Sequence, residues 1–122
     1  MTVEPLTVRD HMPLVRAERL MRESGVSGLP VVDGEGKLVG VLSQPDLMRV
    51  AGESGNEAWH GLSVTSTMTT PGLTVAADAA LAEAAARMEE HRVHRLVVVE
   101  PEGGQPIGIL STTDLVRSIA GG

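Results

Sequence analysis

Residues 25–49 read GVSGLPVVDGEGKLVGVLSQPDLMR, and this stretch decides how the chain folds. Two mostly aliphatic runs, 29–32 and 38–42, flank a turn of residues 33–37 that contains two glycines. Glycine supplies the positive φ angles that tight hairpin turns need, so the pattern predicts two antiparallel strands. The Ser-Gln-Pro-Asp sequence that follows is typical of the first turn of a helix. The stretch therefore predicts a hairpin that leads into a helix.

The same features recur in the same order at residues 93–117, VHRLVVVEPEGGQPIGILSTTDLVR. Here the two apolar runs are 96–99 and 107–110, and a longer loop joins them. A short helix is expected to begin near Ser43 after the first hairpin and near Ser111 after the second.

Sliding the chain against itself by 67 residues, from Met1 to Met68, shows that nearly the whole sequence is duplicated. One extra residue in the second hairpin then moves the register to 68. The matching positions include Met1-Thr2 with Met68-Thr69, 6–8 with 73–75, Leu14 with Leu81, Met21 with Met88, 40–43 with 108–111, and Asp46 with Asp114.

Each hairpin is preceded by a short β-branched run and by apolar residues at helical spacing. These helical positions are Leu14, Ala17, Leu20 and Met21 in the first copy and Leu81, Ala84, Ala85 and Met88 in the second. The unit is therefore β-α-β-β-α, and the fold class predicted is mixed α/β (α+β) with two βαββα repeats. A copy of about fifty ordered residues makes a marginal core, so we expect the two to pack about a pseudo-two-fold axis.

The domain organisation predicted is a first repeat at 1–52, a linker at 53–62 and a second repeat at 63–122. Residues 52–61 are rich in Gly, Glu, Ser and Asn, which is typical of a loop, and Trp59 is its expected anchor.

Composition excludes several classes of protein. The 122 residues are 42% apolar, contain no Cys and carry a formal net charge of −6, so disulfides, thiolate metal sites and a nucleic-acid footprint are not expected. No apolar stretch approaches the roughly 20 residues of a membrane span, and no signal-peptide pattern is present, so we expect a cytoplasmic protein with no membrane partner.

The Met-Thr pair, the Gly-x-x-Ser-x-x-Asp ending of each copy and the duplication itself resemble the CBS-domain family, in which a tandem pair is called a Bateman module. The resemblance covers nearly the whole chain, but the first copy begins at Met1, where the second has five residues, 63–67, before Met68. The resemblance implies a regulatory module that binds AMP, ADP, ATP or S-adenosylmethionine in the cleft between the copies. No other cofactor is expected.

The resemblance also implies which residues line each cleft. Asp46 or Asp114 would hold the ribose hydroxyls, with Ser43 or Ser111 beside the ribose or phosphates. One cleft would combine Leu6, Val26, Ser27 and Gly28 with Ser111, Thr113 and Asp114; the other would combine Leu73, Val93, His94 and Arg95 with Ser43 and Asp46.

Each of these motifs also has a purely structural interpretation. Ser43 with Asp46, and Ser111 with Asp114, fit a capping box, in which the two side chains bond the backbone of a helix's first turn. His91 and Arg92 are cations at the end of a helix, where they complement its dipole.

His94 and Arg95 lie just past the predicted helix end, and the resemblance places phosphate contacts there. Arginine can bind a phosphate with two parallel hydrogen bonds. The first copy has Ser27 and Gly28 at the same positions, so the two sites are predicted to differ in charge.

Catalytic and metal sites are not expected. His91 and His94 lack a clear third ligand for a metal, and the chain has no G-x-S-x-G elbow for a nucleophilic serine. The partners predicted are an adenosine-containing small molecule, an unknown effector protein and a second copy of the chain, with two modules forming a flat disc. The alternative is a ligand-free scaffold that only mediates dimerisation.

Overall fold

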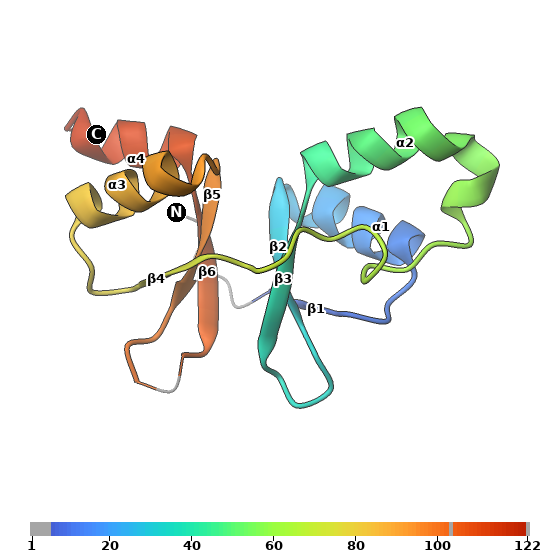
Figure 1. Cartoon of the computed structure of the whole chain (residues 1–122), viewed down its shortest axis with the longest axis horizontal. Coiled ribbons are helices and arrows are strands. Elements are labelled where there is room, and N and C mark those ends of the chain that lie inside the picture. The colour runs from blue at the N-terminus through green and yellow to red at the C-terminus, as the bar shows by residue number, and fades with distance from the viewer. Residues whose placement is uncertain (1–5, 103, 122) are drawn as a thin grey trace. The chain divides into compact units, whose positions relative to one another are not determined.

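The computed structural model describes residues 6–102 and 104–121, which belong to two compact units (Figure 1). The first unit is Leu6–Gly72, and the described part of the second begins at Leu73. The Met1-Thr2 pair of the sequence repeat lies outside the described residues. Each unit contains one three-stranded sheet and two helices, so the mixed α+β class predicted from the duplication is confirmed.

The first unit has the element order β-α-β-β-α that the sequence predicts. Strand β1 pairs in parallel with β2, and β2 pairs in antiparallel with β3. The elements are β1 (Val8–Arg9), α1 (Leu14–Ser24), β2 (Gly28–Val32), β3 (Leu38–Ser43) and α2 (Gln44–Trp59).

The second unit repeats this topology. Strand β4 is parallel to β5, and β5 is antiparallel to β6. A β-bulge occurs at the equivalent place in both units, between Val31 and Val32 and between Val98 and Val99. The elements are β4 (Thr74–Ala76), α3 (Leu81–His91), β5 (Arg95–Val99), β6 (Pro106–Ser111) and α4 (Thr112–Ile119).

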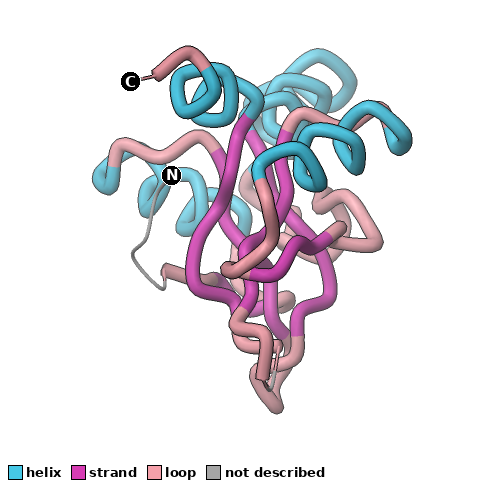
Figure 2. The backbone as a smooth tube through the Cα atoms, turned by 90° about the vertical axis from the view of Figure 1, so that its left-hand side faces the viewer, coloured by secondary structure: helices cyan, strands magenta, loops and turns pink. Residues whose placement is uncertain are grey.

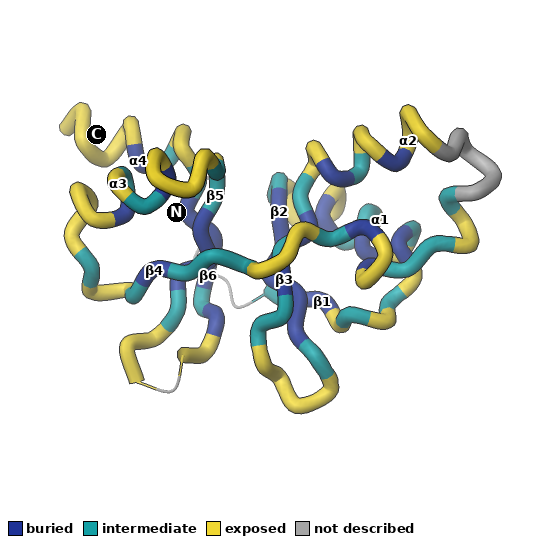
Figure 3. Tube along the Cα trace, in the orientation of Figure 1, coloured by how far each residue is buried: buried dark blue, intermediate teal, exposed yellow. Residues whose placement is uncertain are grey.

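Both helices of a unit lie on the same face of its sheet (Figure 1). In the second unit, Leu96, Val98 and Leu110 share one cluster with Met88 of α3 and Leu115 of α4. In the first unit, Leu29, Val31 and Leu42 likewise cluster with the buried residues of α1. The buried residues follow the sheet-facing sides of the helices, while their outer sides are exposed (Figure 3).

The helices α1 and α3 end in the same way, through a residue in the left-handed conformation. Gly25 has φ 68° after α1, and Arg92 has φ 54° after α3. Glycine adopts this conformation without cost, whereas a residue with a Cβ pays about 1–2 kcal/mol. The second copy therefore ends its helix with a strained residue where the first has a glycine.

Residues 52–61 were predicted to form a loop, and that prediction is wrong for most of the segment. Helix α2 continues through it to Trp59 and has 16 residues, against 8 in α4, so the helix near Ser43 is not short (Figure 1). Figure 2 distinguishes the helices from the loops that join them. Intrinsic propensity is a weak guide that tertiary packing overrides. The packing here comes from Trp59, which lies against the first core as its predicted role of anchor requires.

The segment Ser63–Gly72, called here the connecting segment, packs on the first unit. Val64 is completely buried in the first core, and its N–H donates to the carbonyl of Met12 at 2.9 Å. Farther along, Thr69 and Val41 of β3 exchange two backbone hydrogen bonds of 2.9 and 3.0 Å. The sequence repeat assigns the segment to the second copy, but its described contacts are with the first unit.

Candidate functional site

Most of the residues singled out in the second copy lie where β5 begins, β6 ends and α4 starts, whereas Leu73 directly precedes β4. Arg95 and Ser111 are direct partners in the antiparallel ladder between β5 and β6. The N–H of Thr112 donates to the carbonyl of His94 at 2.9 Å, and its hydroxyl donates to the same oxygen at 3.2 Å. The antiparallel register therefore brings two pairs of residues that are far apart in sequence, His94-Arg95 and Ser111-Thr112, to one end of the sheet.

Arg95 and Ser111 extend to the face of the sheet opposite the helices. Side chains alternate along a strand, and Leu96 and Leu110, the next residues, point into the core under α3 and α4. Residues directly opposite each other on antiparallel strands share a face, with Cβ atoms about 4.5–5.5 Å apart. Arg95 is partly buried, and His94 beside it is exposed.

Ser111 and Asp114 form the capping box that the sequence allows as a structural interpretation. The N–H and hydroxyl of Ser111 both donate to Oδ2 of Asp114, at 3.2 and 2.9 Å, and the N–H of Asp114 donates to Ser111 Oγ at 3.2 Å. Burial favours a raised pKa for Asp114, but opposing effects that include these two hydrogen bonds hold its pKa below the usual value. The carboxylate is therefore charged at neutral pH, next to Ser111 and at the same end of the sheet as Arg95.

The first copy repeats this geometry with Ser43 and Asp46. The N–H and hydroxyl of Ser43 donate to Oδ2 of Asp46 at 2.9 and 3.0 Å, and Gly28 is the ladder partner of Ser43. The neighbouring carbonyl, of Ser27, accepts from the N–H of Gln44 at 3.0 Å. The half-site of the first unit thus has the same backbone frame, but it has no cation at the positions of His94 and Arg95.

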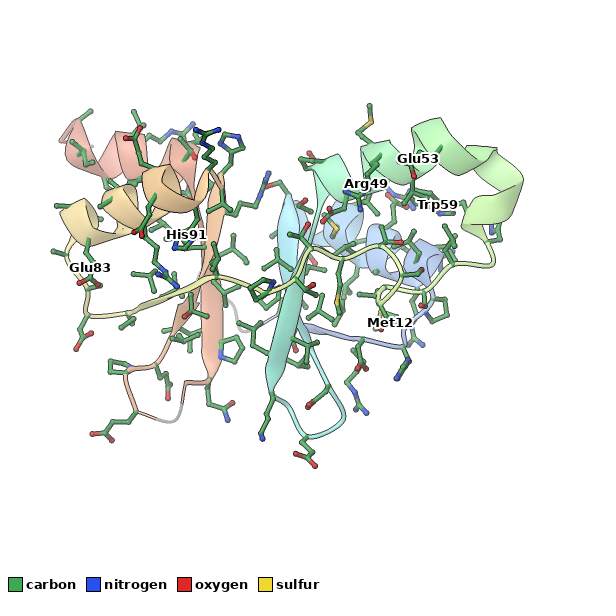
Figure 4. All side chains as sticks on the ribbon, viewed as in Figure 1. Met12, Arg49, Glu53, Trp59, Glu83 and His91 are labelled. Atoms are coloured by element: carbon green, nitrogen blue, oxygen red, sulfur yellow. The ribbon has the colours of Figure 1, made fainter. Side chains whose placement is uncertain are left out.

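Two residues that sequence reasoning missed bind Asp46. Arg49 Nη1 donates to Asp46 Oδ1 at 3.1 Å, and the Thr69 hydroxyl donates to the same oxygen at 2.8 Å. Arg49 projects from α2 in Figure 4. The signals were present in the sequence, because Arg49 aligns with Arg117 and Thr69 belongs to the repeated Met-Thr pair.

The four aliphatic residues proposed for the clefts are partly buried against their own cores. Leu6 and Val26 pack on the first core, and Leu73 and Val93 pack on the second. Thr113 is exposed on the first turn of α4. Each unit thus assembles its own half of the predicted residues, and the combination of halves across the two copies stays a prediction.

A groove lies between the two helices of each unit, on the opposite side from the sheet face that carries Arg95. In the second unit it has a volume of about 520 Å³. The groove of the first unit is smaller, about 430 Å³. The residues that line it occupy positions equivalent to eight of the ten that line the second groove. The second groove is lined by Ala85, Met88, Glu89, Arg92, Val93, His94, Thr112, Leu115, Val116 and Ile119.

Within the described part of the chain, no three His, Asp or Glu side chains are grouped so that they could hold a metal ion. None of the helices described is both long enough and apolar enough to cross a lipid bilayer.

Comparisons with known proteins agree with the duplicated fold. The family model for the CBS domain matches residues 1–53 and again residues 63–121. Inosine-5'-monophosphate dehydrogenase of Bifidobacterium longum is 32% identical over 119 residues, which cover 97% of this chain. The chain spans only 21% of that enzyme and 26% of the uncharacterized protein MJ1404 of Methanocaldococcus jannaschii.

Two solved structures carry ligands. CBSX2 in complex with AMP is 33% identical, with a TM-score of 0.74 over 94% of this chain and 87% of that one. The CBS domain pair of MJ0100, in complex with 5'-methylthioadenosine and S-adenosyl-L-methionine, has a TM-score of 0.81 over 97% of this chain and 93% of that one. That pair is 21% identical, so it supports the fold alone. Two family matches over most of the sequence, on two βαββα units, show that the chain belongs to the CBS-domain family as a tandem pair.

Proposed function

We propose that this CBS pair is a regulatory module that binds an adenosine-containing ligand and signals its presence to a partner protein. The observation that carries the proposal is the group of Arg95, Ser111 and Asp114, which lies at one end of the second sheet. A cation, a hydroxyl and an ionised carboxylate are the groups that a phosphorylated ribose requires. CBSX2, which is 33% identical, binds AMP in its crystal structure.

Each group has a distinct role in this proposal. Asp114 accepts hydrogen bonds from ribose hydroxyls, because an ionised acceptor makes stronger hydrogen bonds than a neutral one. Arg95 binds phosphate oxygens through its planar guanidinium, and His94, the preceding residue, offers a ring N–H to the same phosphate. Ser111 holds Asp114 in place through the capping box. A chain with six excess negative charges gives a phosphate few other attractive positions.

The proposal is tested by calorimetric titration of the protein with AMP, ATP, S-adenosylmethionine and adenosine. Asp114→Ala should weaken binding of the preferred ligand by about 1.5–3 kcal/mol, the range for a hydrogen bond to a charged group. Arg95→Ala should weaken AMP and ATP binding but leave adenosine binding unchanged, since only the phosphate contact is lost. Added salt should narrow that difference, because exposed charge pairs are screened over about 8–10 Å.

Arg16→Ala is the matched control, because it removes the same charge from an exposed position on α1. It should not alter the affinity for any of the four ligands. Equal losses of adenosine and ATP affinity in Arg95→Ala would instead assign Arg95 to packing. If none of the ligands raises the melting temperature of the wild-type protein, the proposed function is wrong, because a ligand bound only to the folded state must do so.

We further propose that two copies of the chain associate through the outer sides of the helices, which carry one groove in each unit. Val116 and Ile119, at the edge of the second groove, are 60% and 61% exposed, and Met48 of α2 is 73% exposed. Each groove also has an acidic and a basic residue beside its apolar floor, such as Glu89 and Arg92 in the second. Such a face complements a second copy of itself. Self-association without any ligand is the second candidate function.

A further inference from the structure

The first of the two Ser-x-x-Asp motifs is engaged by a part of the chain that is distant from it in sequence. We infer that Asp46 is a fastening residue for the connecting segment, and that it supplies no contact to a bound nucleotide. The statement about the nucleotide rests on the proposed function. The statement that Asp46 fastens the connecting segment does not rest on it.

Asp46 is saturated with hydrogen bonds. Oδ2 accepts from the N–H and the hydroxyl of Ser43, and Oδ1 accepts from Arg49 Nη1 and from the hydroxyl of Thr69. An ionised carboxylate has about four lone-pair positions, and four donors lie within 3.1 Å of these two oxygens. A ribose hydroxyl would have to displace one of them.

Burial supports the same conclusion. Asp46 is only 2% exposed, whereas Asp114 at the equivalent position is partly buried. A buried charge is stable only when it is paired and hydrogen-bonded, and removing one partner from such a group is costly. The contacts of Asp46 are therefore a structural requirement of the first unit.

The fastened segment is held through two residues, Thr67 and Thr69. Arg49 Nη2 donates to the carbonyl of Thr67 at 2.8 Å while its other nitrogen binds Asp46. Thr69 binds Asp46 through its hydroxyl and Val41 through its backbone. Asp46 thus joins the start of α2 to a segment 23 residues farther along the chain.

The test uses Thr69→Val, which keeps the shape of the side chain and removes only its hydroxyl. Thr70→Val is the matched control, since Thr70 is the next residue and is exposed like Thr69, but only Thr69 donates to Asp46. Urea unfolding should show an unfolding equilibrium constant at least about tenfold larger for Thr69→Val, because the lost bond is to a charged group. Thr70→Val should unfold like the wild type.

Asp46→Asn provides a second, independent measurement, because an amide cannot accept from donors on both of its terminal atoms. In a double-mutant cycle with Thr69→Val, the two changes should be strongly coupled. Additive effects would overturn the fastening, and this outcome does not depend on any ligand.

The affinity of Thr69→Val for AMP separates the two roles of Asp46. If Asp46 only fastens the segment, AMP binds Thr69→Val as it binds the wild type. If a ribose competes with Thr69 for Asp46, removing the hydroxyl tightens AMP binding, and the inference is overturned. It is also overturned if Asp46→Asn unfolds like the wild type yet loses AMP affinity. Wild-type protein that binds no AMP would refute the choice of ligand, while the coupling between Asp46 and Thr69 would still decide the fastening.

Discussion

Replacing Gly40 by alanine tests how closely the connecting segment approaches β3. A Cβ at Gly40 would lie 2.7 Å from the carbonyl oxygen of Thr69, whereas ordinary contact begins at 3.4 Å. Either Thr69 must move by about 0.7 Å, the difference between those two distances, or β3 must distort. Thr69 and Val41 exchange two hydrogen bonds beside this point, and both would be weakened.

The expected loss of stability combines two effects. Overfilling a packed site costs about 1–3 kcal/mol, and a backbone hydrogen bond contributes about 0.5–1.5 kcal/mol. We therefore expect Gly40→Ala to lower the free energy of unfolding by about 2–4 kcal/mol. With a urea slope of about 1–3 kcal/mol/M, the unfolding midpoint should fall by on the order of 1–2 M.

The assay is urea unfolding followed by fluorescence of Trp59, the single tryptophan of the chain, which packs on the core of the same unit. Gly52→Ala is the control, because a Cβ at Gly52 meets nothing within 4 Å and the residue lies within α2. Alanine should stabilise that helix by up to about 1 kcal/mol. The reasoning is refuted if Gly40→Ala unfolds at the wild-type midpoint.

Three further predictions concern the second unit. Arg92→Gly should raise the melting temperature, since it relieves a left-handed residue that costs about 1–2 kcal/mol; a lower melting temperature would show that the Arg92 side chain contributes more than the strain costs. The pKa of Asp114 is lowered in the folded state, so its contribution to stability is present above the unfolded value of 3.8 and is lost as the pH falls through the folded pKa. Unfolding of wild type and Asp114→Asn at pH values on both sides of 3.8 should therefore show a stability difference that shrinks in acid, and a constant difference would contradict this. Val116→Glu should convert a dimer into a monomer in light scattering, whereas Ser118→Glu, on the same helix, should not; a wild-type monomer would exclude the proposed association.

The topology could be predicted from the sequence because each pattern that indicates a strand or a helix occurs twice, in the same order. The hairpin at 25–49 is recognisable by its glycine turn, and its repetition at 93–117 made a chance pattern implausible. The extent of α2 could not be predicted in this way, since residues 52–61 have the composition of a loop and only the packing of Trp59 shows that the helix continues.

The residue types of the candidate site could be predicted from the sequence, but the hydrogen-bond partners of each residue could not. Ser43 and Asp46 match Ser111 and Asp114 in sequence, and both pairs form the same hydrogen bonds. The motif itself does not reveal Thr69, which reaches Asp46 because the chain returns to β3 after α2. A contact across 23 residues leaves no local pattern, so spacing and periodicity could not reveal it.

The connecting segment decides where such a protein can be divided. The boundary at which the sequence repeats falls near residue 63, but the boundary at which the chain packs falls between Gly72 and Leu73. A gene fragment that ends at residue 62 would encode one full copy of the motif, yet it would lack Val64, which is completely buried in the first core. The repeated unit of sequence is therefore shorter than the unit that packs together. A fragment meant to contain the whole first unit has to extend to Gly72.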